Sequence, residues 1–245
     1  MTGATIWTFD WNGELRDECA VVAGGLINGV QIDEDGKLYF TLNRQKLHER
    51  KVFLAGRAGV FGGVAGKDPF MGCHIKSAAK NVRVLAERSV YGPIPLEQKP
   101  ARPVEVGGGD APGDEGVPEE FCWVEGAEWF YAGSSPIVAE GICCCPTMRP
   151  YLDWYKRSWV PEQYRHSIGI VDTSGNLILH VGRYGNLDSA DGAKSKIPVG
   201  GDNIAMSANR FVSATDNYMV FDDNGERVTA VKLNYHAEET AGMGK

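Results

Sequence analysis

Short β-forming runs separated by tight turns dominate the pattern of hydrophobic and polar residues along this chain. Four segments share one plan, in which a run with alternating apolar residues leads to a turn containing Gly beside Asn, Asp or Ser, and a second run follows. They are TIWTFDWNGELRD, GVQIDEDGKLYFTL, SIGIVDTSGNLILHVG and YMVFDDNGERVTAVKL. Because Gly and Asn accept the positive φ of two-residue hairpin loops, the pattern predicts a series of β-hairpins.

Apolar residues at helical spacing are almost absent between these hairpins. The best helical candidate is SAAKNVRVLAERS, residues 77–89, and its Val-x-Val centre fits a strand equally well. The sequence therefore predicts an all-β protein with at most one or two short helices.

The hairpins recur with loose internal similarity, which is typical of repeat proteins whose units have about 40 to 50 residues. Such units occur over about residues 1–60, 123–187 and 197–234. Repeats with several strands each predict a β-propeller, or part of one, built from four-stranded antiparallel blades. Propellers close with typically four to eight blades, and the recognisable units fall short of a comfortable ring.

A long Pro- and Gly-rich insertion divides the chain. Residues 92–120, GPIPLEQKPARPVEVGGGDAPGDEGVPEE, also contain many acidic residues, a composition that favours an exposed loop over a packed core. We therefore expect propeller blades in residues 1–91, a loop or linker in residues 92–120, and further blades in residues 121–240.

Two parts of the chain resemble known propeller families. GNLILHVGRYGNLDS, together with the run from IPVGGDNIAMS to VTAVKLNY, is similar to blades of the NHL-repeat family. LINGVQIDEDGKLYF resembles the inner-strand pair of the same propellers and, more weakly, that of the gluconolactonase-like family. The resemblance implies a propeller fold.

Composition changes this picture mainly by exclusion. The formal net charge is −7 and no run of Lys or Arg occurs, so we do not expect a nucleic acid as partner. No stretch approaches the roughly 20 apolar residues of a membrane helix, and the first residues lack the features of a secretion signal. The compartment stays open, and a periplasmic or extracellular location is favoured if the chain is a processed piece.

Three consecutive cysteines, Cys143, Cys144 and Cys145, are the first candidate for chemistry. In an extended segment Cys143 and Cys145 point to one face and Cys144 to the other, so the three thiols do not converge. Their spacing also differs from that of structural zinc sites. We interpret them as structural thiols, buried or partly in disulfides if the compartment is oxidising, and a metal or redox role stays open.

Aromatic and basic residues crowd the segment that follows, RPYLDWYKRSWVPEQYRH, residues 149–166. In one interpretation, Arg side chains stack on aromatic rings and tie a loop to the fold. In the other, the segment is a surface that binds a ligand or a protein partner, since interfaces favour aromatic residues and Arg. The candidate binding residues are Trp154, Tyr155, Arg157, Trp159, Tyr164, Arg165 and His166.

The gluconolactonase-like resemblance implies a catalytic alternative. Enzymes of that family hold a divalent cation with Glu, Asn and Asp oxygens, and such ligands suit Ca²⁺ or Mg²⁺, which can polarise a lactone carbonyl. Asn28, Glu125 and Asp202 match those ligands here, although Glu125 lies between the other two in the chain instead of first. Asn and Asp are also typical of turns, so a structural role stays open.

Two functions follow as hypotheses. The first is a non-catalytic NHL-like propeller without a cofactor, which acts as a binding and assembly module for a protein partner or a second copy of the chain. An incomplete ring would leave strand edges unpaired, which favours such association, with Trp154 and Trp159 at or near the contact. The second is a lactonase-like hydrolase that depends on Ca²⁺ or Mg²⁺.

Overall fold

The computed structural model describes residues 5–22, 27–42, 45–48, 51–52, 72–86, 104–107, 122–134, 149–185, 187–189, 204–206, 209–223 and 227–234. Within these ranges the regular elements are β-strands and two 3₁₀ turns, Gln163–Arg165 and Leu187–Ser189. The predicted all-β class is therefore confirmed. None of the described residues forms a helix long and apolar enough to cross a bilayer.

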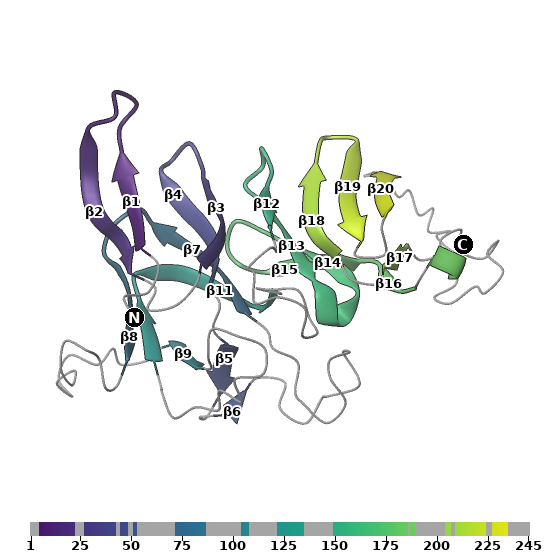
Figure 1. Cartoon of the computed structure of the whole chain (residues 1–245), viewed down its shortest axis with the longest axis horizontal. Coiled ribbons are helices and arrows are strands. Elements are labelled where there is room, and N and C mark those ends of the chain that lie inside the picture. Colours follow the sequence, from purple (N-terminus) through teal and green to yellow (C-terminus); the bar gives the residue numbers. More distant parts are fainter. Residues whose placement is uncertain are drawn as a thin grey trace, which may run out of the picture.

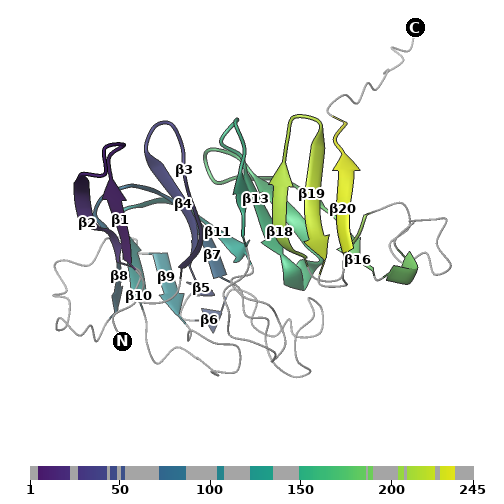
Figure 2. The ribbon, with the colours of Figure 1, turned by 45° about the horizontal axis from the view of Figure 1, so that its top comes forward.

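The strands form a row of sheets along the longest axis of the molecule (Figures 1 and 2). Sheet 1, at one end of the row, has the order β1-β2-β8-β10-β9-β5-β6. Its strands are β1 (Thr5–Phe9), β2 (Leu15–Val22), β5 (Gln45–His48), β6 (Lys51–Val52), β8 (Val82–Ala86), β9 (Val104–Gly107) and β10 (Cys122–Glu125). β2 and β8 are parallel, and the other neighbours are antiparallel.

The next two sheets in the row are four-stranded and antiparallel, as the blade pattern predicts. Sheet 2 has the order β11-β7-β4-β3, with strands β3 (Ile27–Ile32), β4 (Lys37–Leu42), β7 (Gly72–Ala78) and β11 (Ala127–Ser134). Sheet 3 has the order β12-β13-β14-β15, with strands β12 (Tyr151–Leu152), β13 (Ser158–Glu162), β14 (Ser167–Val171) and β15 (Leu177–Val181).

Sheet 4 lies at the other end of the row and has three antiparallel strands (Figure 1). They are β18 (Asn209–Ala214), β19 (Tyr218–Asp223) and β20 (Arg227–Lys232). Between sheets 3 and 4 in the chain, β16 (Arg183–Tyr184) and β17 (Ala205–Met206) form a short parallel pair.

The sheets cross the division expected from the sequence. β7 and β8 come from the first expected part, residues 1–91, yet they pair with β11 and β10 from the part after residue 120. Within residues 92–120, expected to be loop or linker, residues 104–107 form strand β9. Of the helical candidate, residues 77–89, the described residues 77–86 contain the end of β7 and all of β8, so the strand alternative holds in that part.

An aspartate closes each described hairpin loop of the Asp-x-x-Gly type. In the loop that joins β14 to β15, Asp172 Oδ1 accepts hydrogen bonds from the backbone N–H groups of Ser174 and Asn176, each at 2.8 Å. The N–H of Gly175 donates to the carbonyl of Asp172 at 3.1 Å, and Gly175 has a φ of 86°. Asp10 and Asp33 make the same bonds in the β1–β2 and β3–β4 loops.

These loops correct one sequence expectation. The pattern predicts two-residue loops, whereas the N–H of Asp172 donates to the carbonyl of Asn176 at 2.8 Å across three intervening residues. A three-residue loop of this kind combines a turn with a residue in the left-handed region, which Gly occupies at least cost. The aspartate favours the longer loop because its side chain satisfies two backbone donors there.

A fourth loop has the same geometry without glycine. This loop joins β12 to β13. In it, Asp153 Oδ1 accepts hydrogen bonds from the N–H groups of Tyr155 and Arg157, both at 2.9 Å. Lys156 occupies the left-handed position with a φ of 60°. Since a residue with a Cβ costs about 1–2 kcal/mol there, the contacts of Lys156 must offset this cost.

Apolar side chains form the two larger cores between neighbouring sheets, and a smaller cluster of Tyr131, Val160 and Val171 lies between sheets 2 and 3. The core between sheets 1 and 2 contains Val21, Leu38, Phe40, Leu42, Cys73, Ile75, Val82 and Val124. The core between sheets 3 and 4 contains Trp159, Ile168, Ile170, Met206, Val212, Ala214, Met219 and Phe221. Burying each large side chain contributes about 1.5–3 kcal/mol, so these cores hold the row of sheets together.

Alanine at the loop glycines should reveal which loop also packs against a neighbouring sheet. Gly13→Ala and Gly36→Ala should each lower the free energy of unfolding by about 1–2 kcal/mol, because a Cβ there meets open space and only the positive φ is penalised. Gly175→Ala should cost roughly 3 kcal/mol or more, because its Cβ would lie 2.7 Å from Cγ of Trp129. Urea denaturation measures all three, and equal losses would contradict this packing.

Candidate functional site

The interface between sheets 2 and 3 combines a small apolar cluster of Tyr131, Val160 and Val171 with more buried polar side chains than the two larger cores contain. Strand β4 alternates across sheet 2, so that Leu38, Phe40 and Leu42 belong to the apolar core while Tyr39 and Thr41 lie between them in sequence. Tyr39 pairs with Lys76 on β7, and Thr41 pairs with His74. On β11, Trp129 and Tyr131 pair with the same two residues of β7. The side of sheet 2 opposite its apolar core is therefore lined with aromatic and polar side chains.

Glu162 links this side of sheet 2 to sheet 3. Its side chain is completely buried, and one carboxylate oxygen accepts a short hydrogen bond from the Tyr131 hydroxyl. The other oxygen accepts from Oγ of Ser167 and from Nδ1 of His180, both at 2.7 Å. Three donors compensate the removal of this carboxylate from water. Burial, followed by the nearby Glu162 charge, raises the pKa of Tyr131 far above its usual value, so Tyr131 stays a donor.

A glycine makes room for this cluster. Gly169 lies on β14, opposite His180 on β15 and Val160 on β13. A Cβ at this position would lie 2.9 Å from the Tyr131 hydroxyl and 3.1 Å from the carboxyl carbon of Glu162. The absence of a side chain at residue 169 therefore allows the two residues to meet.

His74 is the second buried ionisable side chain of the interface. Its Nδ1 lies 3.4 Å from Oγ of Thr41, which lies 3.2 Å from Oγ of Ser134. Its Nε2 has no hydrogen-bond partner among the described residues. Burial lowers the pKa of His74 from its usual 6.5 to about 3, so the ring is neutral at physiological pH.

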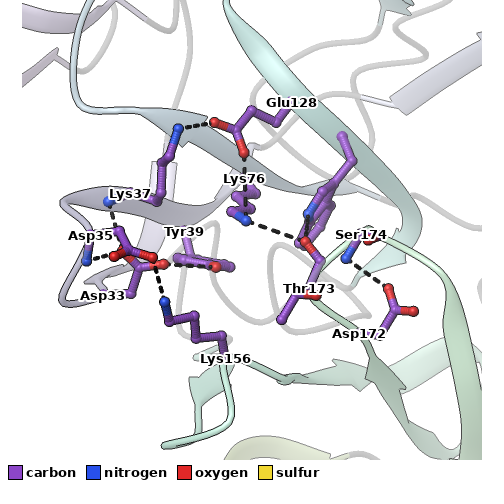
Figure 3. Close-up of polar contacts among 11 residues, drawn as sticks. Asp33, Asp35, Lys37, Tyr39, Lys76, Glu128, Lys156, Asp172, Thr173 and Ser174 are labelled. Atoms are coloured by element: carbon purple, nitrogen blue, oxygen red, sulfur yellow. Dashed lines mark hydrogen bonds and ion pairs between the residues drawn. The ribbon is translucent and has the colours of Figure 1, made fainter.

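Ion pairs cover one end of the same interface (Figure 3). Lys156 of sheet 3 contacts Asp35, and its Nζ also lies 3.0 Å from a carboxylate oxygen of Glu34, both in the β3–β4 loop. These contacts raise the pKa of Lys156 and lower that of Asp35. Lys76 donates to the Thr173 carbonyl at 3.2 Å, as does Nε1 of Trp129 at 3.1 Å. Loops from both sheets are thus joined directly.

The cluster around Glu162 contains part of a catalytic arrangement. A buried carboxylate that accepts from Nδ1 of a histidine orients the ring and leaves Nε2 as the acceptor, which is how a general base is held. The side chain of His180 is 25% exposed, so its ring reaches the surface. The hydroxyls of Ser167 and Tyr131 donate to Glu162 itself, so neither is positioned by the described contacts as a nucleophile for His180.

The three candidate metal ligands do not form a described site. Asn28 lies on β3 in sheet 2, where its side-chain oxygen accepts from the N–H of Gly29 at 3.0 Å. Glu125 is the last residue of β10 in sheet 1, and Asp202 lies outside the described residues. Among the residues that the structure does describe, no group of three or more His, Cys, Asp or Glu side chains could hold a metal ion.

The aromatic and basic segment serves two purposes. Trp159 is 1% exposed and belongs to the apolar core between sheets 3 and 4, so its ring is not available to a ligand. Its Nε1 donates to Oδ2 of Asp153 at 3.0 Å. The Arg157 guanidinium lies 5.6 Å from the Trp159 ring and 5.1 Å from the Tyr155 ring. The interpretation in which stacked Arg ties the segment to the fold thus describes Arg157 and Trp159.

Two other candidates of the segment face solvent. Trp154 is 89% exposed and Tyr155 is 59% exposed, both in the loop between β12 and β13. Sequence analysis missed a third such residue, Trp11, which is 92% exposed. Trp11 follows Asp10 as Trp154 follows Asp153, and this shared Asp-Trp step was the available signal. We call Trp11, Trp154 and Tyr155 the tip residues, because they lie at the tips of hairpins.

The remaining candidate residues lie in the turn that follows β13 or outside the residues that the structure describes. Arg165 is exposed in the 3₁₀ turn after β13, and His166 ends that turn with a φ of 54°. The His166 ring makes an edge contact with Tyr184, with 4.8 Å between centroids. The side chain of Tyr164 lies outside the described part, as do Cys143, Cys144 and Cys145. The described residues contain no disulfide.

Comparisons with known proteins add no assignment. No family model matches the chain, and neither the curated proteins nor the solved structures give a significant match.

The buried neutral His74 should make the protein sensitive to mild acid. The unfolded chain takes up a proton at this residue below pH 6.5 and the folded chain does so only near pH 3, so the free energy of unfolding falls as the pH is lowered between these values. The expected loss is about 1.4 kcal/mol per pH unit. Urea denaturation at several pH values should show this slope reduced in His74→Gln. His166 is only half-buried, so His166→Gln should keep the full slope. Equal slopes in His74→Gln and the unmodified chain would show that His74 is not its source.

Two substitutions at Lys156 should separate backbone strain from ion pairing. Lys156→Ala and Lys156→Gly both remove the contacts with Glu34 and Asp35, but only Ala keeps a Cβ at a φ of 60°. We expect Lys156→Gly to be more stable than Lys156→Ala by about 1 kcal/mol in thermal or urea denaturation. The opposite order would show that the left-handed position carries no strain.

Proposed function

We propose that the chain is an NHL-like partial β-propeller that acts as a non-catalytic binding module for protein partners. The tip residues, Trp11, Trp154 and Tyr155, form its recognition surface. The observation that carries the proposal is the almost complete exposure of two tryptophans, 92% for Trp11 and 89% for Trp154, at the same position of equivalent loops.

The arrangement of the loops supports a shared surface. The loops that join β1 to β2, β3 to β4, β12 to β13 and β18 to β19 project from the same side of the row of sheets (Figures 1 and 2). Trp11 belongs to the first of these loops, and Trp154 and Tyr155 belong to the third. A partner that lies along this side would reach tip residues from sheets 1 and 3 together.

The loops that carry these residues are well anchored. Asp153 holds its loop through two backbone N–H groups and also accepts from Nε of Arg157 at 2.6 Å. Arg157 in turn lies against the ring of Tyr155. Less conformational entropy is lost when a partner binds to side chains on an ordered loop. Tryptophan, tyrosine and arginine are the residues most often found at the energetic centres of protein interfaces.

Cross-linking from residue 154 tests the proposal. A photo-reactive amino acid at position 154 should capture a protein partner in an extract of the native cell, and the same group at the exposed Arg183, on β16, serves as the matched control. The captured protein is then purified, and its affinity for the chain is measured by calorimetry. We expect Trp154→Ala to weaken binding by about 2 kcal/mol, roughly 30-fold, and Trp154→Phe to weaken it less.

Equal capture from positions 154 and 183 would contradict the proposal. It would also fail if the purified partner bound Trp154→Ala, Trp11→Ala and the unmodified chain with the same affinity. Circular dichroism of each variant checks that the sheets are retained, since both tryptophans lie outside the buried cores.

A further inference from the structure

The two end sheets differ from the inner sheets in how their strands are buried. In the inner sheets, β13 and β14 are buried at every residue and β4 at every residue after Lys37, because another sheet covers each face. In the end sheets, β1 and β20 alternate strictly between more and less exposed residues. One face of sheet 1 and one face of sheet 4 therefore lie at the surface.

The outer face of sheet 4 exposes several large apolar side chains to solvent. Val228 is 74% exposed, and Tyr218 and Val220 are also exposed. The strand register places Val220 opposite Ala230. The intervening residues of β19, Met219 and Phe221, are buried in the core with sheet 3. The same face also carries Ser213, Asp222 and Lys232, so the exposed apolar residues form a cluster among polar ones.

On the outer face of sheet 1, β1 and the start of β2 form a similar exposed apolar cluster. Trp7 and Phe9 are exposed on β1. Ile6, the residue before Trp7, packs against the core between sheets 1 and 2. Phe9 pairs with Leu15 of β2, which is also exposed. Exposed apolar clusters of this kind mark interaction sites more often than ordinary surface.

We propose that these two faces bind each other, so that copies of the chain stack head to tail, with sheet 4 of one copy on sheet 1 of the next. The proposal rests on the end faces and is independent of the tip residues. Sheets 1 and 4 lie at opposite ends of the row (Figures 1 and 2), so the two faces of one copy are separated by sheets 2 and 3. Two copies can bring them together.

A second copy fits these faces because the contact continues the packing within the chain. Sheet 3 packs on sheet 4 through alternate apolar residues of facing strands, including Ile168, Val212 and Phe221. Sheet 1 packs on sheet 2 in the same manner. Adding the sheet 1 of another copy to sheet 4 would repeat this face-to-face arrangement. Such a contact joins two different surfaces, so it produces rings where the rotation closes and filaments where it does not.

Complementation of two variants tests the stacking. Val228→Glu places a charge on the outer face of sheet 4, and Phe9→Glu places one on the outer face of sheet 1. In sedimentation velocity at micromolar concentrations, the unmodified chain should associate, and each variant alone should associate roughly 30-fold more weakly. An equal mixture should form a one-to-one dimer, because each variant keeps the face that the other has lost. Leu177→Glu, on the exposed edge of inner sheet 3, is the matched control and should associate normally.

Three results would overturn the proposal. A monomeric unmodified chain would mean that something other than a second copy covers these faces. Unchanged association of either variant would place the contact elsewhere, and a mixture that stays monomeric would indicate contacts between like faces. Circular dichroism checks the fold of each variant, and Val220→Glu with Leu15→Glu provides a second pair on the same two faces.

Discussion

The hydrogen bonds from two backbone N–H groups to one aspartate carboxylate oxygen are the interaction on which this fold depends. Asp10, Asp33, Asp153 and Asp172 each close a hairpin loop in this way. The loop length sets the register of the two strands that it joins, and a slip of one residue would turn every side chain to the opposite face. Both faces of the central strands β4, β13 and β14 are buried, so the register decides whether apolar and polar residues reach the correct interface.

That register gives the molecule two kinds of interface. Leu38, Phe40 and Leu42 reach an apolar core on one side of β4, while Tyr39 and Thr41 reach the polar interface on the other. The polar interface needs specific partners to offset desolvation, and the three donors to Glu162 supply them. It therefore specifies how sheets 2 and 3 are aligned, whereas the apolar cores supply most of the net stability.

Local patterns in the sequence predict the hairpins but not the interfaces. Asp-Gly and Ser-Gly steps locate the β3–β4 and β14–β15 loops correctly, because they report a conformation within a few residues. The β12–β13 loop was missed because Lys156 replaces the glycine. The exposed Trp11 was missed because its only signal in the sequence is the match between Asp10-Trp11 and Asp153-Trp154. Tyr131, Glu162 and His180 are brought together by packing across strands, and no spacing within the chain records that contact.

The polar character of the interface between sheets 2 and 3 also affects how the molecule responds to temperature. Exposing apolar surface raises the heat capacity, whereas exposing polar surface lowers it. The two apolar cores therefore account for most of the heat-capacity change on unfolding, and their contribution weakens on cooling. The hydrogen bonds of Glu162 and the ion pairs of Lys156 do not share this dependence. Toward low temperature, the contact at the middle of the row gains importance relative to the contacts on either side of it.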